Sequence, residues 1–336
     1  MSLSDEVREA EELSELRKTN ASLAKRLKVS NAKTQDMIDA VYRAAYEASL
    51  IIGKGTPIPS PKLSAGKAEV ALVHATDWQY GKGTESYSQA VCEKRIMKFV
   101  QKVEELTNIQ RADHPVNECH LMLGGDMVEG MNIFPGQVYE IESYLFEQLF
   151  GVSALIEQMV SKLLETFPKV VVWEESGNHG RLGRKGENPG GDNIDRMAYK
   201  IAKERMDSTK HKGLTWNSQT SWYQIVEIGN YKCMLAHGDE IKSFGGNTPA
   251  FGILRKCNQW ATGVLEEHSD VYLGHFHTPM TLTLANGARV FITGSPESDN
   301  QYAKEFMAAT GHPSQRIHFI DPRKGRVTSE HLVWLE

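Results

Sequence analysis

The chain has 336 residues, of which 40% are hydrophobic and 24% charged, so it is long enough for one large α/β domain with an extension. Its net charge of −5 argues against a protein that binds polyanions over its whole surface. No apolar run is long enough to span a membrane, and the charged N-terminus predicts no secretory signal. Four scattered cysteines without a CxxC pair indicate free thiols and a cytoplasmic location.

Residues 1–52 are predicted to form a helical extension, because they contain neither Gly nor Pro. Within it, five residues follow one another at the alternating spacings of a coiled-coil seam: Leu13, Leu16, Asn20, Leu23 and Leu27. Two interpretations stay open, since such a helix either packs on its own domain or pairs with a second chain to form a homo-oligomer. Residues 53–67, rich in Gly, Pro, Ser and Lys, are predicted to be a linker, and 68–336 the main domain.

From residue 68 onward, apolar β-branched runs alternate with helical patterns, which is typical of an α/β sandwich. Strands are predicted over 69–76, 119–123, 169–174, 231–236, 270–273, 289–293, 317–320 and 328–335. Helices are predicted over 86–108, 138–166, 190–211 and 249–267.

Five successive predicted strands end in motifs rich in metal-binding side chains. In chain order the motifs are Asp77-Trp78-Gln79, Gly124-Gly125-Asp126, Gly177-Asn178-His179, His237-Gly238-Asp239 and Gly274-His275-Phe276-His277. Each alone is typical of an ordinary turn. Ligands of α/β sheets bind outside the carboxyl ends of the strands, and carboxylates, an amide and several imidazoles together suit a pair of divalent metals. The full set in this order therefore predicts one metal site.

The order of these motifs resembles that of the calcineurin-like metallophosphoesterases, over residues 70–296. A later piece, Gly294-Ser295-Pro296-Glu297-Ser298, is similar to the corresponding segment of the double-strand-break repair exonuclease branch. The resemblance implies a four-layer α/β/β/α metallophosphoesterase sandwich of two mixed sheets, which the N-terminal helical extension precedes. It also implies metal ligands: Asp77 and His277 for the first ion, Asn178, His237 and His275 for the second, and Asp126 between them.

Two positions depart from the family pattern. Gln79 replaces the usual histidine of the first motif, and its amide oxygen either ligates the metal more weakly or bonds a metal-bound water. Gly180 stands where many members carry Asp or Glu, so the orientation of His179 has to come from elsewhere. The resemblance implies that His179 lies beside the scissile phosphate, as general acid or as a stabiliser of transition-state charge.

The resemblance implies a phosphoesterase that uses two divalent ions, with Mn as first choice and Fe, Zn, Ni, Mg or Ca as alternatives. A nucleic acid or nucleotide is the expected substrate, because residues 178–212 hold nine basic and five acidic residues. Arg181, Arg184 and Lys185 are the expected substrate-binding residues. Trp216, Trp222 and Tyr223 either stack bases or belong to the core.

Two alternative functions stay open. One is a small-molecule phosphodiesterase or phosphomonoesterase, for example on cyclic nucleotides, with a pocket closed by the Gly-rich loops 180–191 and 244–248. The other is a non-catalytic binding module whose metal site has decayed, which Gln79, Gly180 and the N-terminal seam would fit.

Overall fold

The computed structural model describes residues 68–131, 133–183, 185–242, 249–297 and 312–336, together with part of residues 15–61. The chain divides into two units, Met1–Gly53 and Lys54–Glu336, each of which is described by itself. In the first unit, the described residues between Glu15 and Glu47 are helical. The coiled-coil pairing stays a prediction, because four of the five seam residues lie outside the described residues: Leu13, Leu16, Leu23 and Leu27.

The first sheet has six strands in the order β11-β10-β1-β2-β3-β4. Their bounds are β1 Glu69–Ala75, β2 Val116–Leu123, β3 Lys169–Glu174, β4 Leu214–Asn217, β10 Ser314–Asp321 and β11 Arg326–Trp334. Strands β1 to β4 are parallel, and β10 pairs antiparallel with β1. The carboxyl ends of β1, β2 and β3, where three of the motifs begin, therefore meet at one edge.

The second sheet has five strands in the order β5-β6-β7-β9-β8. Their bounds are β5 Tyr223–Ile228, β6 Tyr231–Ala236, β7 Asp270–Leu273, β8 Met280–Thr283 and β9 Arg289–Ile292. Strands β6, β7 and β9 are parallel, whereas β5 and β8 run antiparallel to their neighbours. The remaining two motifs follow the neighbouring strands β6 and β7.

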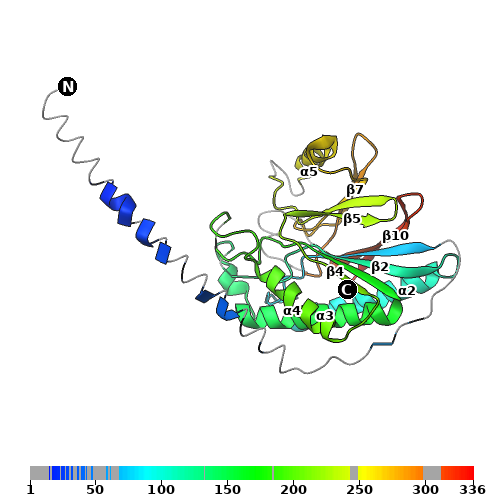
Figure 1. Ribbon diagram of the computed structural model, residues 1–336, viewed down its shortest axis with the longest axis horizontal. Helices are drawn as coiled ribbons and strands as arrows, with labels where there is room; N and C mark the ends of the chain where they lie inside the picture. The colour runs from blue at the N-terminus through cyan, green and yellow to red at the C-terminus, as the bar shows by residue number, and fades with distance from the viewer. Residues whose placement is uncertain are drawn as a thin grey trace. The chain divides into compact units, whose positions relative to one another are not determined.

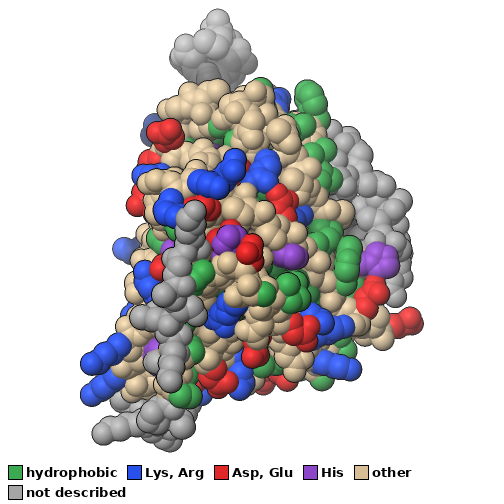
Figure 2. Space-filling view, turned by 90° about the vertical axis from the view of Figure 1, so that its right-hand side faces the viewer, with side chains coloured by type: hydrophobic (Ala, Val, Ile, Leu, Met, Phe, Trp, Pro, Cys, Tyr) green, Lys and Arg blue, Asp and Glu red, His purple; other side chains and the backbone are tan. Residues whose placement is uncertain are grey.

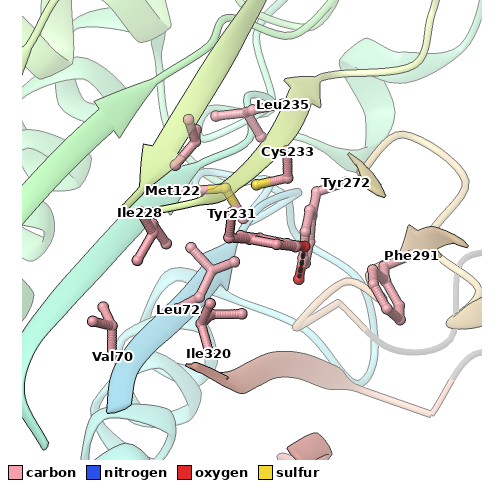
Figure 3. Close-up of a cluster of buried hydrophobic side chains, with 11 residues drawn as sticks. Val70, Leu72, Met122, Ile228, Tyr231, Cys233, Leu235, Tyr272, Phe291 and Ile320 are labelled. Carbon is pink, nitrogen blue, oxygen red and sulfur yellow. Dashed lines mark hydrogen bonds between the residues drawn. The ribbon is translucent and has the colours of Figure 1, made fainter. Parts of the chain in front are cut away.

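The two sheets pack face to face around one apolar core (Figure 3). Leu72 of β1 and Met122 of β2 lie in the same cluster as Tyr231 and Cys233 of β6. The neighbouring residue Met234 belongs to a second cluster on the opposite face. From Cys233 onward, strand β6 is thus buried on both faces, which explains why the run from Cys233 to Ala236 is continuously apolar rather than alternating.

Helices cover the outer faces of both sheets (Figure 1). Helices α2 (Gln89–Gln110), α3 (Leu145–Thr166) and α4 (Ile194–Ser208) lie on the first sheet. Helix α5 (Ala250–Gln259) and the helical turn Trp260–Val264 cover the second, where Ile253, Cys257 and Trp260 pack on residues of β6 and β7. The result is the predicted four-layer α/β/β/α sandwich of two mixed sheets.

Several element boundaries differ from the prediction. The helix predicted over 138–166 begins only at Leu145, after a short 3₁₀ helix at Gln137–Glu140. Residues between these helices pair instead with the segment that follows Gln79, where Glu142 donates its N–H to the Gly81 carbonyl at 2.8 Å. The strands β4, β5 and β8 were not predicted. They are short or form sheet edges, where apolar periodicity is weak.

The described part of the chain contains no helix long and apolar enough to cross a membrane. The four cysteines are buried and form no disulfide. Burial raises the pKa of the Cys92 thiol to about 12, so this side chain stays protonated and unreactive near neutral pH.

Acid should destabilise the fold through His318, which is fully buried and contacts the Tyr272 hydroxyl at 2.7 Å. Burial and the nearby charge of Arg316 lower the pKa of His318 well below 6.5. Below that pH the unfolded chain binds more protons than the folded one, so stability is lost as pH falls, by about 1.4 kcal/mol per pH unit. Urea denaturation between neutral pH and about pH 5 should show a shallower pH dependence for His318→Gln than for the unchanged protein.

The exposed His312 provides the matched control, because its side chain is 68% exposed. His312→Gln should leave the pH dependence unchanged. Parallel curves for His318→Gln and the unchanged protein would show that protonation of this side chain is not coupled to unfolding.

Candidate metal centre

The motifs after β1, β2 and β6 converge on the carboxylate of Asp126, which is 1% exposed. Its Oδ2 lies 3.0 Å from His237 Nε2 and 3.5 Å from Gln79 Nε2. Gln79 Nε2 in turn lies 3.4 Å from His277 Nε2, which is 3.5 Å from Asp77 Oδ1. Asp126 thus stands between two groups of donors, the position that the resemblance implies for a bridging ligand.

One of these groups has the compact arrangement of a metal site. Ligand atoms of Asp126, His237 and His275 all lie within 4.8 Å of one another. The His237 and His275 rings meet edge to face, with centroids 5.2 Å apart. His237 Nδ1 lies 2.8 Å from the Gly124 carbonyl, and this contact directs Nε2 toward Asp126.

Unpaired buried atoms show that the donor set fits a metal. Gln79 Oε1 and Asn178 Oδ1 are buried and have no hydrogen-bond partner among the described residues. Leaving a buried polar atom unpaired costs about 1–3 kcal/mol, so two such amide oxygens in the loops around Asp126 call for a ligand. Carboxylate, amide and imidazole donors together suit borderline divalent ions such as Mn²⁺ or Zn²⁺.

The electrostatics of the centre are dominated by charge pairs within it. Burial opposes ionisation of Asp126, but His237 and His179 hold the pKa of this carboxyl well below its usual range. Burial likewise opposes protonation of His237, yet Asp126 raises its pKa well above 6.5. Burial and the neighbouring His237 lower the pKa of His275 to about 4, so His275 is neutral and able to ligate near neutral pH.

The backbone is strained where the ligand candidates stand. Five of them have left-handed φ angles between 47° and 67°: Asp77, Gln79, Asp126, His275 and His277. Such angles are uncommon for residues other than glycine and cost of the order of 1 kcal/mol or more each. Among the described residues only one other non-glycine residue, Lys210, shares them. The strain is therefore concentrated at the site.

His179 lies beside Asp126 but does not join its donor group. Its backbone N–H donates to Asp126 Oδ1 at 2.7 Å, and its Nδ1 lies 2.7 Å from the Glu129 carbonyl oxygen. Burial opposes protonation, but Asp126 and Glu129 outweigh it and raise the pKa of His179 to about 9. In the metal-free protein His179 is thus protonated near neutral pH, and its ring is held by Glu129 rather than by a side chain at position 180.

Gly180 has no room for the larger residue expected from the family pattern. A Cβ there would lie 2.3 Å from Asn193 Oδ1. Asn193 uses this oxygen to accept the Asp195 N–H at 2.8 Å and so caps α4. The cap of α4 therefore occupies the space that a side chain at position 180 would need, which explains why this position is glycine.

Several basic side chains of the segment 178–212 pair with carboxylates. Arg181 and Lys185 both pair with Asp239, Lys185 at 2.8 Å. Arg184 lies outside the described residues. Arg196 is buried and pairs with Glu175 at 3.0 Å. A role of Arg181, Arg184 and Lys185 in substrate binding stays a prediction.

Sequence reasoning missed the residue that joins two of the motif loops. Asp195 is fully buried, and its carboxylate accepts four backbone N–H groups, from Asp126, Met127 and Val128 after β2 and from Gly177 after β3. Burial and the nearby Asp126 raise the pKa of Asp195 to about 6. No local signal marks Asp195, because its partners are 18 to 69 residues away in the chain.

A second missed element is a buried chain of charges behind His277. Glu297 lies 3.2 Å from His277 Nδ1 and 2.9 Å from Lys82 Nζ, and both Glu297 and Lys82 are at most 4% exposed. Burial opposes ionisation of Glu297, but Lys82 and His277 lower its pKa to about 2. Such a carboxylate fixes the ring of a metal-binding histidine, with the other nitrogen toward the site.

No protein-family model matches this chain, and no curated protein matches it. Among solved structures it is similar to a hypothetical protein from Pyrococcus horikoshii, with 14% identity, 80% of this chain and 88% of that chain covered, and a TM-score of 0.38. Vps29 complexed with zinc from Entamoeba histolytica has 12% identity, coverage of 79% and 99%, and a TM-score of 0.36. A Streptococcus pneumoniae protein described as a predicted phosphoesterase has 12% identity, coverage of 80% and 98%, and a TM-score of 0.32. No conclusion about activity follows from likenesses at this level.

Replacing Glu297 by Gln should weaken metal binding on the His277 side. The amide keeps the shape but loses the charge that holds His277 Nδ1 and offsets the buried Lys82. We expect one equivalent of Mn²⁺ to bind about 10- to 100-fold more weakly, measured by calorimetric titration, while the other equivalent is little affected.

Glu118→Gln is the control, because Glu118 pairs with Lys169 and His120 away from the centre. It should leave both binding events unchanged. Unaltered Mn²⁺ binding by Glu297→Gln would mean that Glu297 serves only to neutralise Lys82.

Proposed function

We propose that this protein is a metal-dependent phosphoesterase that hydrolyses phosphodiester bonds of a nucleic acid or nucleotide. The observation that carries the proposal is the place of Asp126, a buried carboxylate between two groups of imidazole, amide and carboxylate donors. Asp77, Gln79 and His277 would hold one ion, and Asn178, His237 and His275 the other. Two such ions supply Lewis acidity at the phosphoryl oxygens and lower the pKa of a bound water.

The chain's own groups supply positioning and a proton. His179 lies at the edge of the donor groups, with its Nε2 3.9 Å from Asp126 Oδ2, so this nitrogen is placed to donate to a departing oxygen or to stabilise charge on the phosphoryl group. Glu129 holds the opposite nitrogen through its carbonyl oxygen, at 2.7 Å. Phosphoryl transfer needs positioning and charge neutralisation more than a covalent nucleophile, which agrees with a centre built of metal-ligand candidates and one neighbouring histidine.

A small-molecule substrate is the second candidate, and one observation favours it. A cavity of about 330 Å³ opens beside the centre and is lined by Gly177 and Asp239, which adjoin Asn178 and lie near His237 in the chain. Such a volume is at the lower end of pockets that hold small organic molecules.

Two substitutions should separate metal binding from turnover. Asp126→Asn removes the shared carboxylate. We therefore expect this variant to lose its bound Mn²⁺ and also its hydrolysis of bis(p-nitrophenyl) phosphate. His179→Ala keeps the ligands, so metal content should persist while turnover falls about 10²- to 10⁴-fold. Metal analysis and rates with Mn²⁺, with and without a chelator, give both readouts, and a panel of phosphomonoesters and single- and double-stranded DNA ranks the substrates.

His312→Ala, at an exposed histidine, should change neither quantity. An unchanged rate in His179→Ala would contradict the role given to that imidazole. Binding of less than one Mn²⁺ equivalent, with no hydrolysis of any ester, would favour a binding module with a decayed centre.

A further inference from the structure

The cavity beside the centre has an aromatic wall. Trp222 lines it and is 38% exposed, although its ring packs against Tyr223 and Trp260 with centroids 4.7 and 5.3 Å away. A large aromatic side chain held in place by two others, yet open to solvent, is a preformed surface for stacking a flat ring. Of the three aromatic residues singled out in the sequence, Trp222 is the one that lines this cavity.

The polar groups of the cavity favour a neutral guest that donates hydrogen bonds. Its three cationic side chains already have acidic partners, since Arg181 and Lys185 pair with Asp239 and Arg196 pairs with Glu175. Figure 2 shows, on the face it presents, basic side chains lying close to acidic ones. A second phosphate would therefore find no unpaired cation among the described lining residues.

Glu240 brings a carboxyl group to the lining of the same cavity. Burial and the neighbouring Asp239 raise the pKa of this carboxyl to about 7, so it is an ionised acceptor above that pH. Its Oε2 is buried and has no hydrogen-bond partner among the described residues. Carboxylates accept from the exocyclic amino groups of nucleobases, as in the pairing of Glu or Asp with the cytosine amino group. Trp222 and Glu240 together thus offer stacking and an edge contact, the two interactions that recognise an unpaired base.

We propose that this cavity is a nucleobase-binding subsite that prefers a base with an exocyclic amino group, joined to the nucleotide whose phosphate lies at the metal centre. The link to the phosphate rests on the proposed function, whereas recognition of the base rests on the cavity alone. Because the cavity adjoins the loops of Asn178 and His237, a nucleotide would place its base there and its phosphate at the ligands.

Free nucleosides test the subsite without involving hydrolysis. Cytidine and uridine have the same size and differ at the amino or carbonyl group of C4, so calorimetric titration should show tighter binding of cytidine. Trp222→Ala should weaken both by roughly tenfold through the loss of stacking. Glu240→Gln should abolish the difference between them, because an amide offers a donor as well as an acceptor.

Tyr139→Ala is the matched control, since Tyr139 is 91% exposed and does not line the cavity. It should leave binding of both nucleosides unchanged. Equal affinity in Trp222→Ala, equal binding of cytidine and uridine by the unchanged protein, or no nucleoside binding at millimolar concentration would each overturn the subsite. Hydrolysis of bis(p-nitrophenyl) phosphate reports separately on the proposed function. The base subsite can therefore fail while the phosphoesterase activity stands, and the activity can fail while the subsite stands.

Discussion

The carboxylate of Asp195 is the constraint on which the centre depends most. Four backbone N–H groups from the loops after β2 and β3 converge on it, at distances of 2.9–3.3 Å. A fully buried carboxylate is costly unless its oxygens are hydrogen-bonded, so these loops and the start of α4 are fixed relative to one another. Asp126 and Asn178 belong to those loops. Helix α4, which supplies no ligand candidate, thereby sets the geometry of two of them.

That fixed framework explains how the strained backbone persists. The left-handed angles of Asp77 and Gln79 occur where both residues donate their N–H groups to the loop after β2, to the carbonyls of Gly125 and Asp126 at 2.9 and 3.1 Å. The Asp77 carboxylate also accepts the His275 N–H at 2.9 Å. Hydrogen bonds between loops of both sheets offset the local strain, and in return the side chains are aimed into one space before any ion binds.

The sequence predicts those parts of the site that are local to a strand end. Each motif follows an apolar run, so Asp77, Asp126 and His237 are recognisable one motif at a time, and the alternation of elements predicts the layers. Asp195 escapes this reasoning, because its partners are remote in the chain and nothing near it distinguishes a structural carboxylate from a surface one. Glu297 lies in the segment 294–298 noted in the sequence, but its contacts with Lys82 and His277 depend on the fold and could not be read locally. The predicted helix start at residue 138 was wrong for a similar reason, since pairing with a distant segment overrode local helical periodicity and α3 begins only at Leu145.

The structure makes Gln79 a question of orientation as well as of residue type. In this arrangement its Nε2, a donor, faces Asp126 and His277, while its Oε1 is buried without a partner. Oxygen and nitrogen of an amide exchange places by a half-turn of the group. Under the proposed function, direct ligation of an ion by Gln79 requires that turn, because only the oxygen ligates, whereas a hydrogen bond from Nε2 to a metal-bound water does not. The group of Asp126, His237 and His275 requires no such change, so the two halves of the centre differ in how ready they are for metal.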